Sequence, residues 1–475
     1  MNAKVLTALL TVIVFAAGAV AGYFIPNEII KQQVKKQATD YFVKKDFSMP
    51  FQTFTTFTFE NLIGNAAPWA KKYLDESVSR DLEHSVKEKY AYRYQAAVKG
   101  LKSNADAAAY LKQTGILGEI NLSQEEALKK LASLAPSSTL MIPGAPFTKA
   151  YMNSAPDLSV RLPAEYEPIE SVFVSFPILY PSQWKTHLSL IDAISKEAVA
   201  VVLVPDEFWH RSVILYLQQK GLALNSIRFA YVKTDDVWTR DYGPTNVLMS
   251  DGSKAFIWNN YYEEYTSFAK LSADAAGELG RYFDLPVYRV PLVVEGGNII
   301  SDGKGTIIMF DSVLKNNPDY DTAKLRDVMK KYYGCTNLVL LPRLKGELTG
   351  HIDMVVKYVD SETLMVIESE ENYQWYQDFE KIADKLSKTR SSSGKEYKIV
   401  RMKMASSGED SERFWSYINS LTVNGSVIVP IFRTKEDKAA LELYRKVMPG
   451  YKITGIDFSN YPVGSVHCQT KEMYQ

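Results

Sequence analysis

The feature that most constrains the fold of this 475-residue chain is a unit of strands and one helix that recurs in its C-terminal two-thirds. Short β-branched or aromatic runs at residues 171–176, 200–204 and 226–232 alternate with amphipathic segments of helical spacing. The unit recurs about every 50 to 60 residues, about five times. This repeat predicts an α/β fold in which related modules form a ring, a propeller of five blades.

Helices and hairpins are expected at regular places within this repeat. The hairpins are expected at 246–258, turning at Asp251-Gly252, and at 298–310, turning at Asp302-Gly303. The helices are expected at 183–196, 208–220, 270–282, 322–333, 374–388 and 435–446. A doubly wound open sheet is the alternative fold, but the glycine-rich phosphate loop expected after its first strand is absent from the sequence.

The residues before the repeat divide into a helical region at 27–135 and a linker at 136–159 that contains a Pro, Ser and Gly stretch, which leaves 160–475 as the catalytic domain. Helical spacing is clear at 105–113 and 124–134, and Ser123 with Glu126 resembles a capping box. The run at 51–59 alternates phenylalanine with threonine, which indicates a strand or extended segment. The helical region is interpreted as an anchor, spacer or oligomerisation element.

The first 26 residues carry an uncharged apolar stretch at 5–25 after Lys4. Ala19-Val20-Ala21 is a small-x-small pattern suited to cleavage of a signal peptide. A stretch of about 20 residues is also long enough for a membrane-spanning anchor. Both alternatives predict an extracytoplasmic protein, either secreted or anchored to the membrane through its N-terminus.

The overall composition narrows the partners and the use of cysteine. Lys plus Arg and Asp plus Glu both number 55, so no global field recruits nucleic acid. Two cysteines allow at most one disulfide, which a chain of this length does not need. Cys335 stands at the junction of a helix and an apolar strand and is expected to be buried. Chemistry is therefore the better use for Cys468.

Three segments upstream of Cys468 carry the groups that a cysteine needs to attack a guanidinium. They are Trp238-Thr-Arg-Asp-Tyr-Gly-Pro244, Glu295-Gly-Gly-Asn298 and Gly350-His-Ile-Asp353. A guanidinium carbon is a weak electrophile because its charge is spread over three nitrogens, so carboxylates must hold the group while a thiolate attacks it. Asp241 and Asp353 are the expected carboxylates. The Trp238 ring is an expected apolar wall for the alkyl stem of the substrate.

His351 is the expected acid and base, because an imidazole can protonate departing ammonia and later accept a proton from water. Glu295, just before two glycines that let the backbone bend, would hold the ring and favour the imidazolium. A tight turn between strands is the alternative interpretation of this segment, and both can hold. On an extended strand Asp353 and His351 would share one face, whereas His467 would point away from Cys468, which favours a structural role for His467.

These segments, with 162–168 and Ser416-Tyr-Ile-Asn419 followed by 427–430, resemble the agmatine deiminase and bacterial peptidylarginine deiminase family of the pentein superfamily. The resemblance implies a five-bladed α/β propeller of repeated ββαβ-like modules with the active site at its centre. It implies Cys468 as nucleophile, His351 as acid and base with Glu295 as its partner, and Asp241 and Asp353 as the guanidinium clamp. It implies a covalent thiouronium intermediate, and no metal or organic cofactor.

Two substrates compete within this resemblance. A peptidylarginine deiminase would give peptidylcitrulline and ammonia, and an agmatine deiminase would give N-carbamoylputrescine and ammonia. Export and the tail at 464–471 favour the peptidyl branch. The segment 258–264 lacks the arginines that grip a C-terminal carboxylate in secreted members, and Glu263 or Glu264 would suit a cationic substrate. A non-catalytic pentein that binds a partner is the alternative of another class, but it predicts loss of the cysteine or its carboxylates, and none is lost.

Overall fold

The computed structural model describes residues 92–143 without 94 and 98, and then residues 151–234, 236–261, 270–347, 349–406, 414–461 and 464–475. The apolar stretch at 5–25 and the phenylalanine and threonine run at 51–59 lie outside these residues. Among the helices that are described, none has the length and apolar character needed to cross a bilayer.

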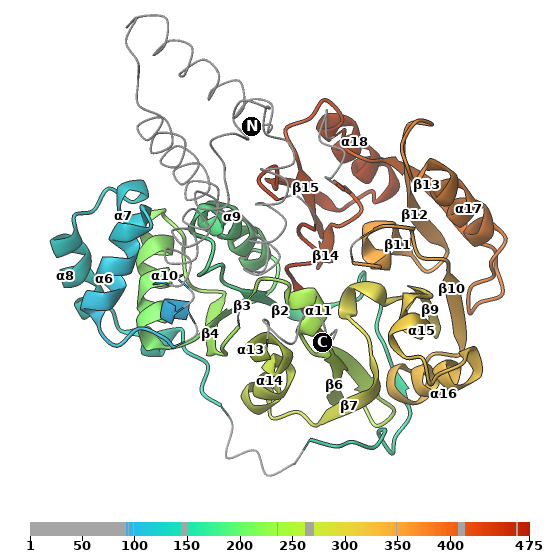
Figure 1. Ribbon diagram of the computed structural model, residues 1–475, viewed down its shortest axis with the longest axis horizontal. Coiled ribbons are helices and arrows are strands. Elements are labelled where there is room, and N and C mark those ends of the chain that lie inside the picture. The colour runs from blue at the N-terminus through green and yellow to red at the C-terminus, as the bar shows by residue number, and fades with distance from the viewer. Residues whose placement is uncertain are drawn as a thin grey trace, which may run out of the picture.

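The described strands form five sheets that follow one another around a common centre (Figure 1). One sheet has the order β17 (Lys471–Tyr474), β2 (Ile169–Ser175), β3 (Val199–Val204) and β4 (Ile227–Tyr231). The next contains β1 (Val160–Arg161), β5 (Thr245–Met249), β6 (Lys254–Asn260) and β7 (Val287–Val293). The third sheet contains β8 (Ile300–Ser301), β9 (Thr306–Phe310) and β10 (Asn337–Leu341). The fourth contains β11 (Val356–Asp360), β12 (Thr363–Glu368) and β13 (Lys398–Lys403). The fifth contains β14 (Leu421–Val423), β15 (Ser426–Ile431) and β16 (Lys452–Asp457).

Each sheet contains the same unit, an antiparallel strand pair followed by a helix and a third strand that is parallel to the second. A parallel pair needs a long crossover, which the helix provides. The crossover helices are α9 (Trp184–Ser195), α13 (Lys270–Ala273) with α14 (Ala275–Phe283), α15 (Ser312–Asn316) with α16 (Thr322–Tyr333), α17 (Tyr376–Ser387) and α18 (Asp437–Val447). The prediction of five repeated modules is confirmed.

The ring closes by joining the two ends of the domain. β17 pairs antiparallel with β2, so that Lys471 lies opposite Phe173. The C-terminal strand therefore supplies the first strand of a module whose other strands come from the start of the domain. One further crossover, α10 (Glu207–Gln219), carries the chain from β3 to β4 at the edge of this sheet.

The predicted helices and turns are present, with one difference. Gly252 and Gly303 adopt positive φ values of 85° and 71° in the two predicted hairpin turns, a conformation that suits glycine. The single helix expected at 270–282 is interrupted at Asp274, where α13 ends and α14 begins.

The described N-terminal helices pack onto the propeller rather than standing apart from it. They are α6 (Asn104–Gln113), α7 (Ile116–Glu119) and α8 (Gln124–Ser133), and the predicted capping box between Ser123 and Glu126 is confirmed. The Tyr110 ring meets the Trp209 ring of α10 edge-on with centroids 4.6 Å apart. These helices share one hydrophobic core with the sheets. The role of 27–135 as an anchor, spacer or oligomerisation element stays a prediction.

The stretch expected as a linker also contributes to the fold. It begins with a short 3-10 helix, η1 (Pro136–Ser138). Leu140 then pairs in parallel with Phe229 of β4, and Met152 pairs in parallel with Tyr288 of β7. The described part of 136–159 therefore adds single backbone pairs to two sheets. Its interpretation as a linker stays a prediction.

Candidate active site

The site residues lie in equivalent positions of the five modules. Each stands in the connection that leads into the first strand of a module. Asp241 lies in α11 (Thr239–Tyr242) before β5, and Glu295 lies at η3 (Gly296–Asn298) before β8. His351 and Asp353 lie at η4 (Ile352–Met354) before β11, Asn419 lies before β14, and Cys468 lies in the turn before β17. Because the modules surround one centre, equivalent connections meet there. Residues more than 200 positions apart are brought together in this way.

His351 lies buried between two carboxylates. Its Nε2 is 2.7 Å from Oε2 of Glu295, and its Nδ1 is 3.5 Å from Oδ1 of Asp241. Burial opposes protonation of the ring, but Asp241 and Glu295 outweigh that effect and raise the pKa of His351 to about 10. The imidazolium form is therefore favoured at neutral pH.

The two glycines after Glu295 are required by close approach and not by backbone bending. Neither Gly296 nor Gly297 has a positive φ, which corrects the expected reason for glycine here. A Cβ at Gly297 would lie 2.6 Å from Nδ1 of His351 and 2.7 Å from Oδ1 of Asp241. The Gly297 N–H instead donates to Asp241 at 3.0 Å. The expected tight turn is present as η3, so it coexists with the contact between Glu295 and His351.

Cys468 is a buried free thiol whose sulfur faces three groups. The side-chain amide of Asn419 donates to Sγ at 3.2 Å, Oδ2 of Asp353 lies 3.9 Å from Sγ, and Sδ of Met354 lies 4.0 Å from it. Burial, followed by the charges of Asp353 and Asp241, raises the pKa of Cys468 well above its usual value. A cation bound beside Sγ would favour the thiolate form.

Asp353 presents one oxygen to the protein and leaves the other available. Oδ2 accepts a hydrogen bond from Nδ1 of His467 at 2.7 Å. Oδ1 is buried and has no hydrogen-bond partner in the part of the chain that the structure describes. Burial, together with the charge of Asp241, raises the pKa of Asp353 to about 7 against the lowering effect of His351. Burial likewise raises the pKa of Asp241 to about 6. A cation bound beside these two carboxylates would favour their ionised forms.

The local conformation around Asp353 and His467 differs from the extended strands expected from the sequence. Ile352–Met354 is a 3-10 helix, and β11 begins only at Val356. The chain turns sharply here because Gly350 has a positive φ of 68° and the Glu347 carboxylate accepts the Thr349 N–H at 2.9 Å. Residues 466–469 also form a turn. The alternation of side chains along a strand therefore does not apply to Asp353 and His351, or to His467 and Cys468.

Trp238 lies beside the turn that carries Cys468. A Cβ added at Gly464 would lie 2.7 Å from Cζ3 of Trp238 and 3.4 Å from Cβ of Cys468. The indole ring is only partly buried. Trp238 and Cys468 therefore both lie close to Gly464, and the role of Trp238 as an apolar wall stays a prediction.

The model of the Porphyromonas-type peptidyl-arginine deiminase family matches residues 161–473, about two-thirds of the chain. The match contains every residue placed around His351 and Cys468. The chain belongs to this family. Members of the Porphyromonas-type peptidyl-arginine deiminase family are hydrolases of C–N bonds in linear amidines, and this chain is one of them.

Curated relatives are similar in sequence to this member of the peptidyl-arginine deiminase family. The "Putative agmatine deiminase" of Pectobacterium atrosepticum is 27% identical over 357 residues, which cover 66% of this chain and 94% of the relative. The protein of the same description from Marinomonas is 27% identical over 354 residues, with the same coverage of each chain.

Solved structures confirm the pentein fold. Agmatine deiminase of Enterococcus faecalis superposes with a TM-score of 0.62 at 22% identity, over 69% of this chain and all of that one. The "Putative Arginine Deiminase from Porphyromonas gingivalis" superposes with a TM-score of 0.59 at 23% identity, over 66% of this chain and 98% of that one.

Arg240 is a site residue whose role the sequence analysis missed. Its Nε donates to the carbonyl of His467 at 3.1 Å, and its backbone N–H donates to the carbonyl of Cys468 at 3.1 Å. Its guanidinium forms a pair of hydrogen bonds with the Glu472 carboxylate, one of them 2.8 Å long. Arg240 therefore connects the turn that carries Cys468 to α11, which contains Asp241. The position of Arg240 next to Asp241 in the sequence was the signal that could have indicated a place in the site.

Replacement of Glu472 by Gln should destabilise the protein by about 3–5 kcal/mol, because it leaves the buried Arg240 charge without its partner. Chemical denaturation monitored by circular dichroism measures this change. The matched control is Glu125→Gln, which removes the exposed Lys129–Glu125 pair on α8 and should leave the unfolding free energy unchanged within error. Equal effects of the two substitutions would contradict the assignment.

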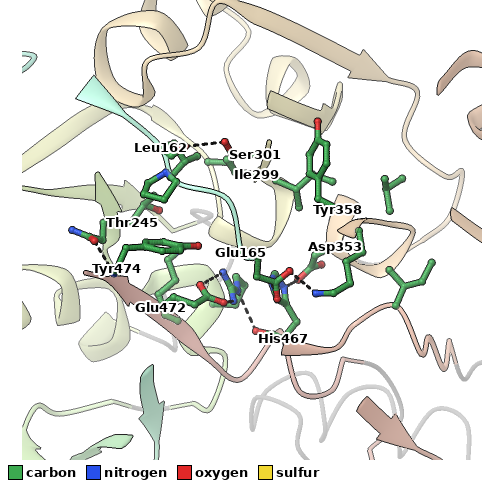
Figure 2. A pocket seen from close by; sticks show the side chains of 18 residues that line it. Leu162, Glu165, Thr245, Ile299, Ser301, Asp353, Tyr358, His467, Glu472 and Tyr474 are labelled. Carbon is green, nitrogen blue, oxygen red and sulfur yellow. Dashed lines mark hydrogen bonds and ion pairs between the residues drawn. The ribbon is translucent and has the colours of Figure 1, made fainter. Parts of the chain in front are cut away.

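A cavity of about 50 Å³ is bordered on one side by Asp353. It is bordered by β5, β8, β11 and β17, the first strands of four modules. Figure 2 shows Glu165, Asp353, His467 and Glu472 close to one another in this cavity. The Glu165 carboxylate pairs with Lys357, which also donates to the carbonyl of Ser420 at 2.9 Å. Space for a few water molecules remains among these groups.

Two groups of side chains have ligand atoms close enough to hold a metal ion, Asp241 with Glu295 and His351, and Glu165 with His467 and Glu472. In the first group both ring nitrogens of His351 face carboxylates, and the imidazolium form has no lone pair for a metal. In the second group, Lys357 and Arg240 already compensate the carboxylates. The donor sets therefore suit an organic cation better than a metal ion, and the expectation of no metal stays a prediction.

The pH dependence of turnover follows from these pKa shifts. A guanidinium binds the ionised forms of Asp241 and Asp353, so kcat/KM should rise as the pH increases through about 6 to 7. It should fall as the pH passes about 10, where His351 loses its proton. Ammonia release at subsaturating substrate measures this profile. Replacement of Asp353 by Asn should make the acid limb shallower, and a flat profile of the unsubstituted protein between about pH 5 and 8 would contradict the prediction.

Proposed function

We propose that this protein is an exported peptidylarginine deiminase, which converts peptidylarginine and water into peptidylcitrulline and ammonia through a covalent intermediate on Cys468. The observation that carries the proposal is the charge of the site. Three buried carboxylates, those of Asp241, Glu295 and Asp353, surround one imidazolium and one thiol, and Oδ1 of Asp353 is open for a further donor. A planar cation with several N–H groups satisfies both needs.

The first half of the reaction forms the intermediate. The guanidinium of the substrate binds Asp241 and Asp353, and its positive charge lowers the pKa of the Cys468 thiol, which then loses its proton to solvent. The thiolate attacks the guanidinium carbon to give a tetrahedral adduct. His351 donates a proton to one terminal nitrogen, the bond between carbon and that nitrogen breaks, and ammonia leaves. The product of this half is a thiouronium on Cys468.

The second half consumes water. Neutral His351 accepts a proton from a water molecule as the water oxygen attacks the thiouronium carbon. The carbon–sulfur bond then breaks, the sulfur takes the hydroxyl proton of the adduct and leaves as the thiol, and the substrate retains a neutral ureido group. Glu295 holds the His351 ring at 2.7 Å in both halves and stabilises its charged form.

Agmatine is the second candidate substrate, and the curated relatives support it, because both are described as agmatine deiminases. The family model supports the peptidyl substrate. Glu263 and Glu264, which the sequence suggests for a cationic substrate, lie outside the described residues. A non-catalytic pentein receives less support, because Cys468, His351 and all three carboxylates are present and close together.

The test of the proposed function is ammonia release from four substrates under reducing conditions: agmatine, free arginine, a peptide with an internal arginine and a peptide with a C-terminal arginine. The proposal expects the largest kcat/KM with an arginyl peptide. A larger value for agmatine would favour the second candidate. No ammonia from any of the four would contradict deimination altogether.

Export is part of the proposal and rests on the apolar stretch at 5–25. Fusion of residues 1–40 to a bacterial alkaline phosphatase, which is active only outside the cytoplasm, tests it. The fusion should be active, and replacement of two central leucine or valine residues of the stretch by arginine should abolish that activity. An inactive unsubstituted fusion would contradict export.

A further inference from the structure

His467 connects the guanidinium clamp to the charged cavity behind it. Its Nδ1 lies 2.7 Å from Oδ2 of Asp353 on the side of the active site. Its Nε2 lies 3.6 Å from Oε1 of Glu165 on the side of the cavity. The ring is buried, with 5% of the residue exposed. The mechanism proposed above gives His467 no part, although it contacts a substrate-binding carboxylate directly.

The backbone of His467 is held by two other modules. Its carbonyl accepts a hydrogen bond from Nε of Arg240 at 3.1 Å, and its N–H donates to the carbonyl of Asn419 at 3.2 Å. The side chain therefore projects from a fixed point toward Asp353. A hydrogen bond between two fixed groups can set the orientation of a carboxylate.

The charges around His467 favour a neutral ring. Arg240, Lys357 and Lys471 are the cations near it, and Glu165, Asp353 and Glu472 are the anions. Burial, followed by these three cations, lowers the pKa of His467 well below its usual value. Nδ1 faces a carboxylate oxygen at hydrogen-bond distance, so the proton of the neutral ring belongs on Nδ1.

We propose that His467 is a positioning residue for guanidinium binding, whose Nδ1–H holds Oδ2 of Asp353 so that Oδ1 faces the substrate. The inference rests on the proposed function, in which Asp353 binds the guanidinium. A neutral imidazole suits this task because it orients the carboxylate without placing a second positive charge beside the substrate. A lysine or arginine in its place would bind Asp353 but repel the guanidinium.

The experiment compares three variants of His467 that separate its two nitrogens. In His467→Asn, the amide nitrogen can take the place of Nδ1. In His467→Gln, the amide nitrogen takes the place of Nε2 instead, and in His467→Leu no donor remains. All variants carry Cys335→Ser, so that Cys468 is the one cysteine of the chain. The Asn and Gln variants keep polar side chains of similar size, so the comparison survives if the Leu variant does not fold.

The readout is the rate at which two reagents alkylate Cys468, a cationic chloroacetamidine and neutral iodoacetamide. Their ratio measures recognition of an amidinium separately from the reactivity of the thiol. We expect a large preference for the cationic reagent in the parent and in the Asn variant. The Gln and Leu variants should lose about 10- to 100-fold of that preference, as expected for a hydrogen bond to a charged group, while their iodoacetamide rates change less than about threefold.

Each other outcome overturns a stated part of the account. If the Gln variant keeps the preference of the Asn variant, the hydrogen bond from Nδ1 does not position Asp353. If the rates with both reagents fall together and their ratio stays constant, the role of His467 is structural only. If the parent itself shows no preference for the cationic reagent, the guanidinium site of the proposed function fails, and the inference about His467 fails with it.

Discussion

Replacement of Cys468 by Ser should reduce ammonia release by about 10⁴-fold or more, the size of loss seen when a covalent nucleophile is removed. A serine hydroxyl can still accept the hydrogen bond from Asn419, so the local structure should be kept. It cannot form an anion in this site, because two carboxylates already raise the pKa of the group at this position. The substrate that releases most ammonia from the unsubstituted protein serves for the measurement.

The matched control for this substitution is Cys335→Ser, in the other cysteine of the chain. Cys335 is buried in a separate hydrophobic cluster that includes Ile307 and Leu338. Its replacement should leave turnover within about threefold. The Cys468→Ser protein should still bind the substrate, because Asp241 and Asp353 are intact, and calorimetry can show this. Retention of more than about 1% of activity by Cys468→Ser would rule out attack by this sulfur.

Replacement of His351 by Gln should lower kcat by about 10³-fold, because one imidazole serves both as acid and as base, and general acid–base catalysis contributes about 10²- to 10⁴-fold. Glutamine can still donate to Glu295 but cannot transfer a proton at neutral pH. The fall of kcat/KM above about pH 10 should disappear in this variant, since His351 is the group that titrates there.

The control for this substitution is made at another buried histidine, His210, which lies in α10. Its Nε2 is 3.0 Å from Oγ1 of Thr139, next to η1. His210→Gln should keep turnover within about threefold and keep the high-pH limb. Loss of that limb in His210→Gln, or its survival in His351→Gln, would show that the proton donor has been assigned to the wrong residue.

The module pattern could be predicted because the strands and helix of most modules follow one another directly along the chain. The helix expected at 322–333 has those bounds in α16, since Asp321 caps its start and Gly334 ends it. The pairing of β17 with β2 could not be predicted in this way, because it joins residues about 300 positions apart. The packing of Tyr110 on Trp209 depends on the same kind of distant contact.

The candidate site shows the same limit. Residue types and motif order pointed to Cys468, His351, Glu295, Asp241 and Asp353, and the structure brings these residues together. Their catalytic and binding roles stay predictions. The hydrogen bond from Asn419 to the sulfur and the contact between His467 and Asp353 were missed, because both cross from one module to another. The 3-10 helix at Asp353 also makes strand alternation the wrong basis for predicting where the Asp353 side chain points.

The central claim is that the sulfur of Cys468 bonds to the guanidinium carbon during turnover. Acid quenching of the working enzyme, followed by intact-protein and peptide mass spectrometry, measures this most directly. The account predicts an adduct with the mass of the substrate minus ammonia, located on the peptide that contains Cys468 and absent from Cys468→Ser. Steady turnover with Cys468 unmodified at every quench time, or an adduct on another residue, would contradict it.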